Sequence, residues 1–233
     1  MATVEPAPLV KEQLAGRLRD AIVEGRLRPG ERVSEGVWAR EFGVAQASVR
    51  EAINLLIAEG FVVKNSGKSA RVTQYTAQDV ERIYQLRGAL EGLAAQLAAA
   101  AHADLSALEA ALANMESAQQ RGHVRDLIAS DLAFHLSLGQ ASGNPLLAEA
   151  LSRLLRPLFS FVLLRMIETQ ESAAKWAPGL SRHRQMIDLI RDSHPNVAKQ
   201  FVEYCVGRFV EAAHAVWWPD ANPRRRSHKK EQP

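Results

Sequence analysis

The clearest hydrophobic pattern of the chain lies in residues 43–60, which read GVAQASVREAINLLIAEG. Four apolar side chains recur there at helical spacing and predict one amphipathic helix after a short turn: Val49, Ile53, Leu56 and Ile57. Gln46, Ser48 and Arg50, near its start, point away from that apolar face. Such hydrogen-bonding side chains suit a helix that reads the major groove of DNA, although a core helix with a polar outer face has the same periodicity.

Two more helices and a β-hairpin are predicted on either side of this helix. An apolar stripe at helical spacing predicts a first helix, which Gly25 ends. A turn at Pro29-Gly30 follows, and Ser34 is placed to cap a second, short helix that reaches Phe42. Downstream, the segment FVVKNSGKSARVT predicts two short strands around a turn that contains glycine. Three helices and a hairpin in this order predict a winged helix-turn-helix.

From residue 76 onward the apolar positions repeat at helical spacing and predict no strand. Thr76 and Asp79 have the spacing of a capping box at the start of the first of these helices. Pro157 is predicted to kink or split the fourth helix, and Pro178-Gly179 to break the chain before the fifth. The fold class is therefore mainly α. The second part of the chain is an all-α bundle of six or seven helices, near residues 80–101, 105–115, 127–141, 145–171, 180–191 and 195–217.

The composition is that of a folded chain without a membrane segment. Apolar residues make up 47% of the 233 residues and charged residues 24%, which suits a sizeable core. No apolar run is long enough to span a membrane, and no signal-peptide pattern is present. The single Cys205 excludes an internal disulfide and suits a reducing compartment. We therefore expect a cytoplasmic protein with no membrane partner.

The positions of turn and cap residues, together with the distribution of charge, divide the sequence into four segments. We expect a DNA-binding domain in residues 1–75, a linker in residues 76–78, a helical domain in residues 79–218 and a basic, disordered tail in residues 219–233. In the long segment between residues 76 and 223, acidic residues outnumber basic ones by three. This balance argues against nucleic acid binding by the helical domain.

One group of side chains in the helical domain has the chemistry of metal ligands. Asp131 and His135 stand four residues apart and therefore project from one face of a helix. His183 begins the next-to-last helix, and Cys205 lies within the last. Carboxylate, imidazole and thiolate all bind zinc and related divalent ions. Spacing alone leaves a plainer interpretation open, because Asp-x-x-x-His is often a surface pair and a lone cysteine is often a small buried hydrophobe.

The first domain has a fixed pattern of turn and helix residues: Gly25, Pro29-Gly30, Ser34-Glu35, Gly43-Val44, Val49-Arg50-Glu51-Ala52 and Glu59-Gly60. With this spacing it closely resembles the DNA-binding domain of GntR-family bacterial transcription regulators. The resemblance implies that Arg50 contacts DNA, and that Gly67 and Lys68 form a wing tip that reaches the minor groove. Gln46 and Ser48 stand where the family commonly has Arg and Pro, so the operator sequence of relatives does not carry over.

The helical domain has a second pattern: Tyr84, Arg87, Leu90-Glu91, Asp131-x-x-Phe134-His135, Ser142-Gly143-Asn144, His183 and Ala198. It resembles the FCD effector-binding domain, the C-terminal half of the FadR branch of the GntR family. In many FCD domains an Asp and three His hold a divalent metal, which with a nearby Arg holds a small carboxylate. The resemblance implies Asp131, His135 and His183 as ligands, with Cys205 at the fourth position in place of His. The implied cofactor is a divalent metal, zinc in the first instance, although some members bind effector without metal.

Two further residues are candidates for contact with an effector. Arg87 suits a carboxylate, because a guanidinium binds one bidentately, and an ion pair with Glu91 at i+4 is a compatible alternative. Asn144 is the second candidate, and its alternative role is to cap the helix that Pro145 begins.

These features predict a homodimeric transcription regulator that binds double-stranded operator DNA and responds to a small organic acid. One winged helix reads only a few base pairs, so two half-sites and a two-fold dimer are expected. Two alternatives stay open: a constitutive DNA-binding dimer without effector, and a metal-dependent enzyme with a DNA-targeting module. The enzyme is disfavoured, because the sequence shows no positioned general base beyond the ligand set and no nucleophile motif.

Overall fold

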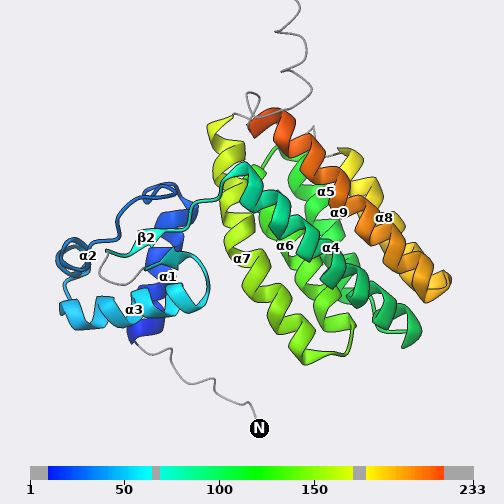
Figure 1. Cartoon of the computed structure of the whole chain (residues 1–233), viewed down its shortest axis with the longest axis horizontal. Helices are drawn as coiled ribbons and strands as arrows, with labels where there is room; N and C mark the ends of the chain where they lie inside the picture. Colours follow the sequence, from blue (N-terminus) through cyan, green and yellow to red (C-terminus); the bar gives the residue numbers. More distant parts are fainter. Residues whose placement is uncertain (1–9, 65–68, 170–176, 218–233) are drawn as a thin grey trace, which may run out of the picture. The chain divides into compact units, whose positions relative to one another are not determined.

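The computed structural model describes residues 10–64, 69–169 and 177–217 (Figure 1). Within it the chain divides into two compact units, residues 1–74 and residues 75–233. Each unit has its own buried core. None of the helices among the described residues is long and apolar enough to cross a membrane.

The first unit is a winged helix-turn-helix. It contains helices α1 (Val10–Val23), α2 (Glu35–Phe42) and α3 (Gln46–Ala58), followed by strands β1 (Val62–Val63) and β2 (Arg71–Val72). The two strands are antiparallel, with Val62 opposite Val72. The segment before α2 extends this small sheet, because Arg32 bridges to Arg71 and the amide of Val33 donates to the carbonyl of Ala70 at 2.9 Å. The predicted order of three helices and a hairpin is confirmed.

The core of this unit lies where α1 packs against α3. Leu18, Val49 and Leu56 have no exposed surface, so the apolar face predicted for α3 is the face that turns inward. The turn between α2 and α3 uses Gly43, whose φ of 67° is left-handed and closes α2 at its C-terminus. Ser34 occupies the N-cap position of α2, as predicted, but its side chain makes no capping hydrogen bond.

The second unit is all-α among its described residues. Thr76 and Asp79 form the predicted capping box: the amide of Asp79 donates to the Thr76 hydroxyl at 3.1 Å, and the amide of Thr76 donates to the Asp79 carboxylate at 3.0 Å. Two of the three residues assigned to a linker therefore begin the first helix of the bundle. The six helices are α4 (Ala77–Ala100), α5 (Ser106–Gln120), α6 (Val124–Ala141), α7 (Pro145–Glu168), α8 (Ala177–Asp192) and α9 (Pro195–Trp217).

Of the two outcomes predicted for Pro157, a kinked helix or a split one, the split does not occur. Helix α7 runs through Pro157 as one element, because Leu155 and Leu158 on either side of it are fully buried and hold both halves in the core. Pro178 lies in the first turn of α8, because this helix begins at Ala177 and not near Leu180 as predicted. Proline is tolerated in a first turn because the amide it lacks has no partner within the helix.

Helix α4 is the central helix of the bundle. It packs most extensively on α9 and also contacts α6, α7 and α8, while α6 lies between α5 and α7 (Figure 1). Close approach is achieved by small residues: a Cβ at Gly139 of α6 would lie 3.3 Å from the Cα of Ala148 in α7. This packing brings the inner faces of α4, α6 and α8 together, which is where the polar residues of the core are found.

Candidate functional site

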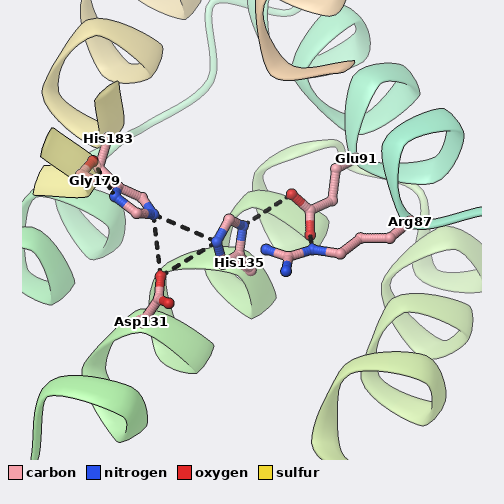
Figure 2. Close-up of polar contacts among 6 residues, drawn as sticks. All are labelled: Arg87, Glu91, Asp131, His135, Gly179 and His183. Atoms are coloured by element: carbon pink, nitrogen blue, oxygen red, sulfur yellow. Dashed lines mark hydrogen bonds and ion pairs between the residues drawn. The ribbon is translucent and has the colours of Figure 1, made fainter. Parts of the chain in front are cut away.

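Three predicted metal ligands meet inside the bundle (Figure 2). Helix α6 supplies Asp131 and His135 on one face, one turn apart, and α8 supplies His183. The Oδ1 atom of Asp131 lies 3.0 Å from Nε2 of His183 and 3.3 Å from Nε2 of His135. The two Nε2 atoms are 3.4 Å apart, and all three side chains are buried.

Each imidazole is oriented by an acceptor on its far side. Nδ1 of His183 lies 2.8 Å from the carbonyl oxygen of Gly179, and a carbonyl can only accept, so this nitrogen carries the hydrogen. Nδ1 of His135 lies 2.9 Å from Oε2 of Glu91, a close ion-pair contact that is poorly aligned for a hydrogen bond. A carboxylate also favours the hydrogen on the nitrogen that faces it. Both rings therefore direct their Nε2 atoms toward Asp131, where each can bind a metal when it carries no hydrogen.

The donor set fits a divalent cation. One ligand atom from each of Asp131, His135 and His183 lies within 4.8 Å of the other two. The Asp131 oxygen is buried and touches both rings, yet it has no well-formed hydrogen bond among the described residues. Buried polar atoms of this kind are normally satisfied, and two imidazole nitrogens with one carboxylate oxygen are ordinary zinc ligands.

The charges around this cluster also favour a cation. Burial opposes ionisation of Asp131, but contacts with the two imidazoles outweigh it and hold the pKa of this carboxyl well below its usual range. Burial opposes ionisation of Glu91 too, yet Arg87 and then His135 lower its pKa to about 2. Two ionised carboxylates against the single guanidinium of Arg87 leave the cluster one negative charge when both rings are neutral.

Arg87, the candidate for an effector carboxylate, is buried beside this cluster with 5% of its surface exposed. Its Nε donates to Oε1 of Glu91 at 2.7 Å, so the alternative intrahelical ion pair is present. Its guanidinium carbon lies 5.1 Å from the ring centres of both Tyr84 and Phe159. Figure 2 shows the terminal nitrogens directed toward His135, from the opposite side to Asp131.

Two predicted site residues, Cys205 and Asn144, are not part of the cluster of Asp131, His135 and His183. Cys205 is buried, but its thiol lies outside the group of three ligands, which corrects the expectation of four converging ligands. Burial raises the pKa of this thiol, with Arg182 opposing, so Cys205 behaves as the small buried hydrophobe that spacing alone suggested. Asn144 caps α7, because its side-chain oxygen accepts from the amides of Leu146 and Leu147 at 3.1 and 3.3 Å.

Glu91 is the site residue that the sequence interpretation left in a minor role. The sequence predicts it only as a partner of Arg87, whereas in the structure it also contacts His135. Its signal in the sequence is a lone acidic residue on the inward face of α4, between Gly88 and a run of buried alanines. A fully buried carboxylate is rare unless it is paired, which makes such a position worth attention.

Three of the predicted DNA-binding residues lie at the start of α3. Gln46 and Arg50 are exposed, and Ser48 is half-buried. Arg50 is held by Glu35 of α2, with Nη2 at 2.7 Å and Nε at 3.0 Å from the same carboxylate oxygen. This hydrogen-bonded contact lowers the pKa of Glu35. The predicted wing-tip residues, Gly67 and Lys68, and the basic tail lie outside the described residues.

A winged helix-turn-helix followed in the chain by an all-helical unit is the architecture of a DNA-binding transcription regulator. Residues 10–72 match the family described as bacterial regulatory proteins, gntR family, and residues 82–208 match the FCD domain. The chain belongs to the GntR family, in the FadR-type branch that carries an FCD domain. This membership sets aside the alternative of a metal-dependent enzyme.

Known relatives agree with this assignment. The uncharacterized HTH-type transcriptional regulator YdhC of Bacillus subtilis is 30% identical over 82% of this chain and 84% of its own. LutR of the same organism, also an HTH-type transcriptional regulator, is 31% identical over 64% of this chain and 74% of its own. In structure, E. coli McbR/YncC has a TM-score of 0.72 at 20% identity, covering 93% of this chain and 100% of its own. At that identity the likeness concerns the fold.

Proposed function

We propose that this regulator binds double-stranded operator DNA as a homodimer, and that a small organic acid bound in the helical unit controls its affinity for that DNA. The observation that carries the proposal is the buried cluster of Asp131, His135 and His183, joined through Glu91 to Arg87. Packing alone has no need to gather these charged groups, because burying each of them costs free energy.

In this proposal the three ligands hold a divalent metal, with zinc as the first candidate. The bound metal supplies a positive charge that attracts a carboxylate oxygen. Arg87 supplies directed hydrogen-bond donors, so that a carboxylate is held by its geometry as well as by its charge. Asn144 stays a secondary candidate for an effector contact, because its oxygen is already engaged as a helix cap.

The DNA contacts of the proposal come from Gln46, Ser48 and Arg50 at the exposed start of α3. Two copies in a dimer present two such helices to two half-sites. An effector that binds one conformation of the helical unit better than another shifts the population of dimers whose helices match the operator. The coupling is limited by that difference in affinity.

The proposal is tested with metal-free protein, prepared with a chelator, in a thermal-shift screen. Zinc is added alone, and then with a panel of mono-, di- and hydroxycarboxylates. We expect zinc to raise the melting temperature, and at least one acid to raise it further only when zinc is present. Gel shifts on DNA selected from a random pool then show whether that acid changes operator affinity. Selected DNA that binds equally well under all these conditions would identify a constitutive DNA-binding dimer instead.

A further inference from the structure

We propose that Glu91 is a positioning residue that serves two parts of the site at once: it sets the ligand nitrogen of His135, and it holds Arg87 at the cluster. The inference rests on the proposed function, because it assumes that His135 binds a metal and that Arg87 faces an acid. It concerns a residue that touches neither the metal nor the acid in that proposal.

The geometry places Glu91 between these two residues. Its carboxylate has no exposed surface, and each oxygen has a different neighbour. Oε1 accepts from Nε of Arg87 at 2.7 Å, one turn earlier on α4, and Oε2 lies 2.9 Å from Nδ1 of His135 on α6 (Figure 2). One side chain therefore connects two helices and both halves of the proposed site.

The chemistry of the two neighbours requires a carboxylate at this position. The guanidinium of Arg87 can only donate, and His135 is a metal ligand through Nε2 only if Nδ1 carries the hydrogen. Glu91 thus faces two donors with two acceptor oxygens. A carboxylate beside Nδ1 also makes the imidazole a stronger ligand, an arrangement that recurs behind metal-bound histidines.

Replacement of Glu91 by glutamine preserves the shape of the side chain but replaces one of its two acceptor oxygens by a donor group. The amide has one acceptor and one donor, so it can keep the bond from Arg87 only by turning its NH₂ group toward His135. Nδ1 of His135 must then accept, and the hydrogen moves to Nε2, where it blocks ligation. We therefore expect Glu91→Gln to weaken zinc binding about 10- to 100-fold.

The control is Glu203→Gln on α9. Glu203 is half-buried against Gly92, the residue next to Glu91, and it pairs only loosely with Lys199 at 3.9 Å. The same chemical change there removes a carboxylate near α4 without reaching either imidazole. Zinc affinity, measured by competition with a chromogenic chelator, should stay at the wild-type value in this variant.

A second measurement reports the tautomer directly. Burial opposes the charged form of His135, but Glu91 and Asp131 raise its pKa, so ¹⁵N-histidine NMR of zinc-free protein is recorded at increasing pH until this ring is neutral, and then shows which ring nitrogen carries hydrogen. We expect Nδ1 for His135 in the wild type and Nε2 in Glu91→Gln, with the signal assigned by its loss in His135→Ala. An unchanged tautomer, or unchanged zinc affinity in a folded Glu91→Gln protein, overturns the inference.

Two further outcomes are distinguishable. Wild-type protein that fails to bind zinc contradicts the proposed function, while the tautomer comparison still decides the role of Glu91. If Glu91→Gln fails to fold, Glu91→Asp serves in its place, because it keeps the charge but shortens the reach by one methylene. A carboxylate that no longer spans both neighbours should also weaken zinc binding, and wild-type affinity in Glu91→Asp counts against the inference.

Discussion

Arg50, the residue proposed to contact a base, is oriented by a neighbouring carboxylate. Glu35 holds its guanidinium at the exposed start of α3 through three hydrogen bonds. An exposed ion pair of this kind contributes little to stability, so its main effect is to orient the side chain. The proposed base contact therefore starts from an arginine whose conformational freedom is already reduced.

Arg50→Ala should weaken binding to selected operator DNA by about 1–3 kcal/mol, with a smaller loss on random DNA, because a base contact carries sequence information. Quantitative gel shifts measure both losses. Glu35→Ala is the matched control, since it breaks the same ion pair but keeps the arginine. Equal losses in the two variants would show that the ion pair, and not a base contact, accounts for the effect.

His135→Ala should abolish stabilisation by zinc, because one of three proposed ligands is lost. In the wild type, zinc at 100 times its Kd should stabilise the fold by about 2.7 kcal/mol, seen as a rise in melting temperature. His123→Ala serves as the control, since His123 is exposed before α6 and contacts Asp126 instead. A zinc response that survives in His135→Ala would remove this residue from the ligand set.

At the scale of the helix, the start of α4 depends on its cap. Thr76→Ala removes the hydroxyl that accepts from the amide of Asp79, and should lower the free energy of unfolding by about 1 kcal/mol. Chemical denaturation followed by circular dichroism measures it. Ser34→Ala, at the N-cap of α2, should cost much less because that hydroxyl makes no capping hydrogen bond. Similar losses in both variants would contradict the capping argument.

The contact between α6 and α7 depends on a residue without a side chain. A Cβ at Gly139 would lie 3.2 Å from a methyl of Leu151 and 3.3 Å from the Cα of Ala148, so Gly139→Ala should destabilise the fold by about 1–3 kcal/mol. Gly207→Ala is the matched control on α9, where a Cβ meets open space. Its higher helix propensity should stabilise the protein by up to about 1 kcal/mol. Thermal unfolding of the two variants should therefore shift in opposite directions.

The elements were predictable from the sequence to the extent that local pattern decides them. Apolar periodicity located all the helices described, and the spacing of Thr76 and Asp79 identified a real capping box. Pro157 does not split α7, because the leucines buried on either side of it compensate for one lost backbone hydrogen bond. Local pattern does not contain that tertiary compensation.

The site was predictable only in part, for the same reason. Spacing puts Asp131 and His135 on one face, but the arrival of His183 depends on how α8 packs, and only the resemblance to a known domain implied it. The resemblance also implied Cys205, which the fold leaves outside the group. Glu91 was underestimated because its second partner comes from a different helix.

At the scale of the whole molecule, two half-sites require two recognition helices. Light scattering of the full chain should therefore give about twice the 25.7 kDa chain mass. His135→Ala should have the same mass, since the cluster of proposed metal ligands is internal to one bundle. A stable monomer at micromolar concentration would contradict the two-half-site mechanism while leaving the fold unaffected.

The Glu91 carboxylate contacts both Arg87 and His135, so binding of an acid and binding of a metal affect each other. An acid that engages the arginine weakens the hold of that arginine on Glu91, and this leaves more negative charge facing the imidazole. By thermodynamic linkage, if the acid raises the affinity for the metal by some factor, the metal raises the affinity for the acid by the same factor. Under the proposed function, the response of the regulator to the acid would then depend on whether the metal is also bound. In a cell short of the metal, such a regulator would respond less to the same concentration of the acid, although the protein itself is unchanged.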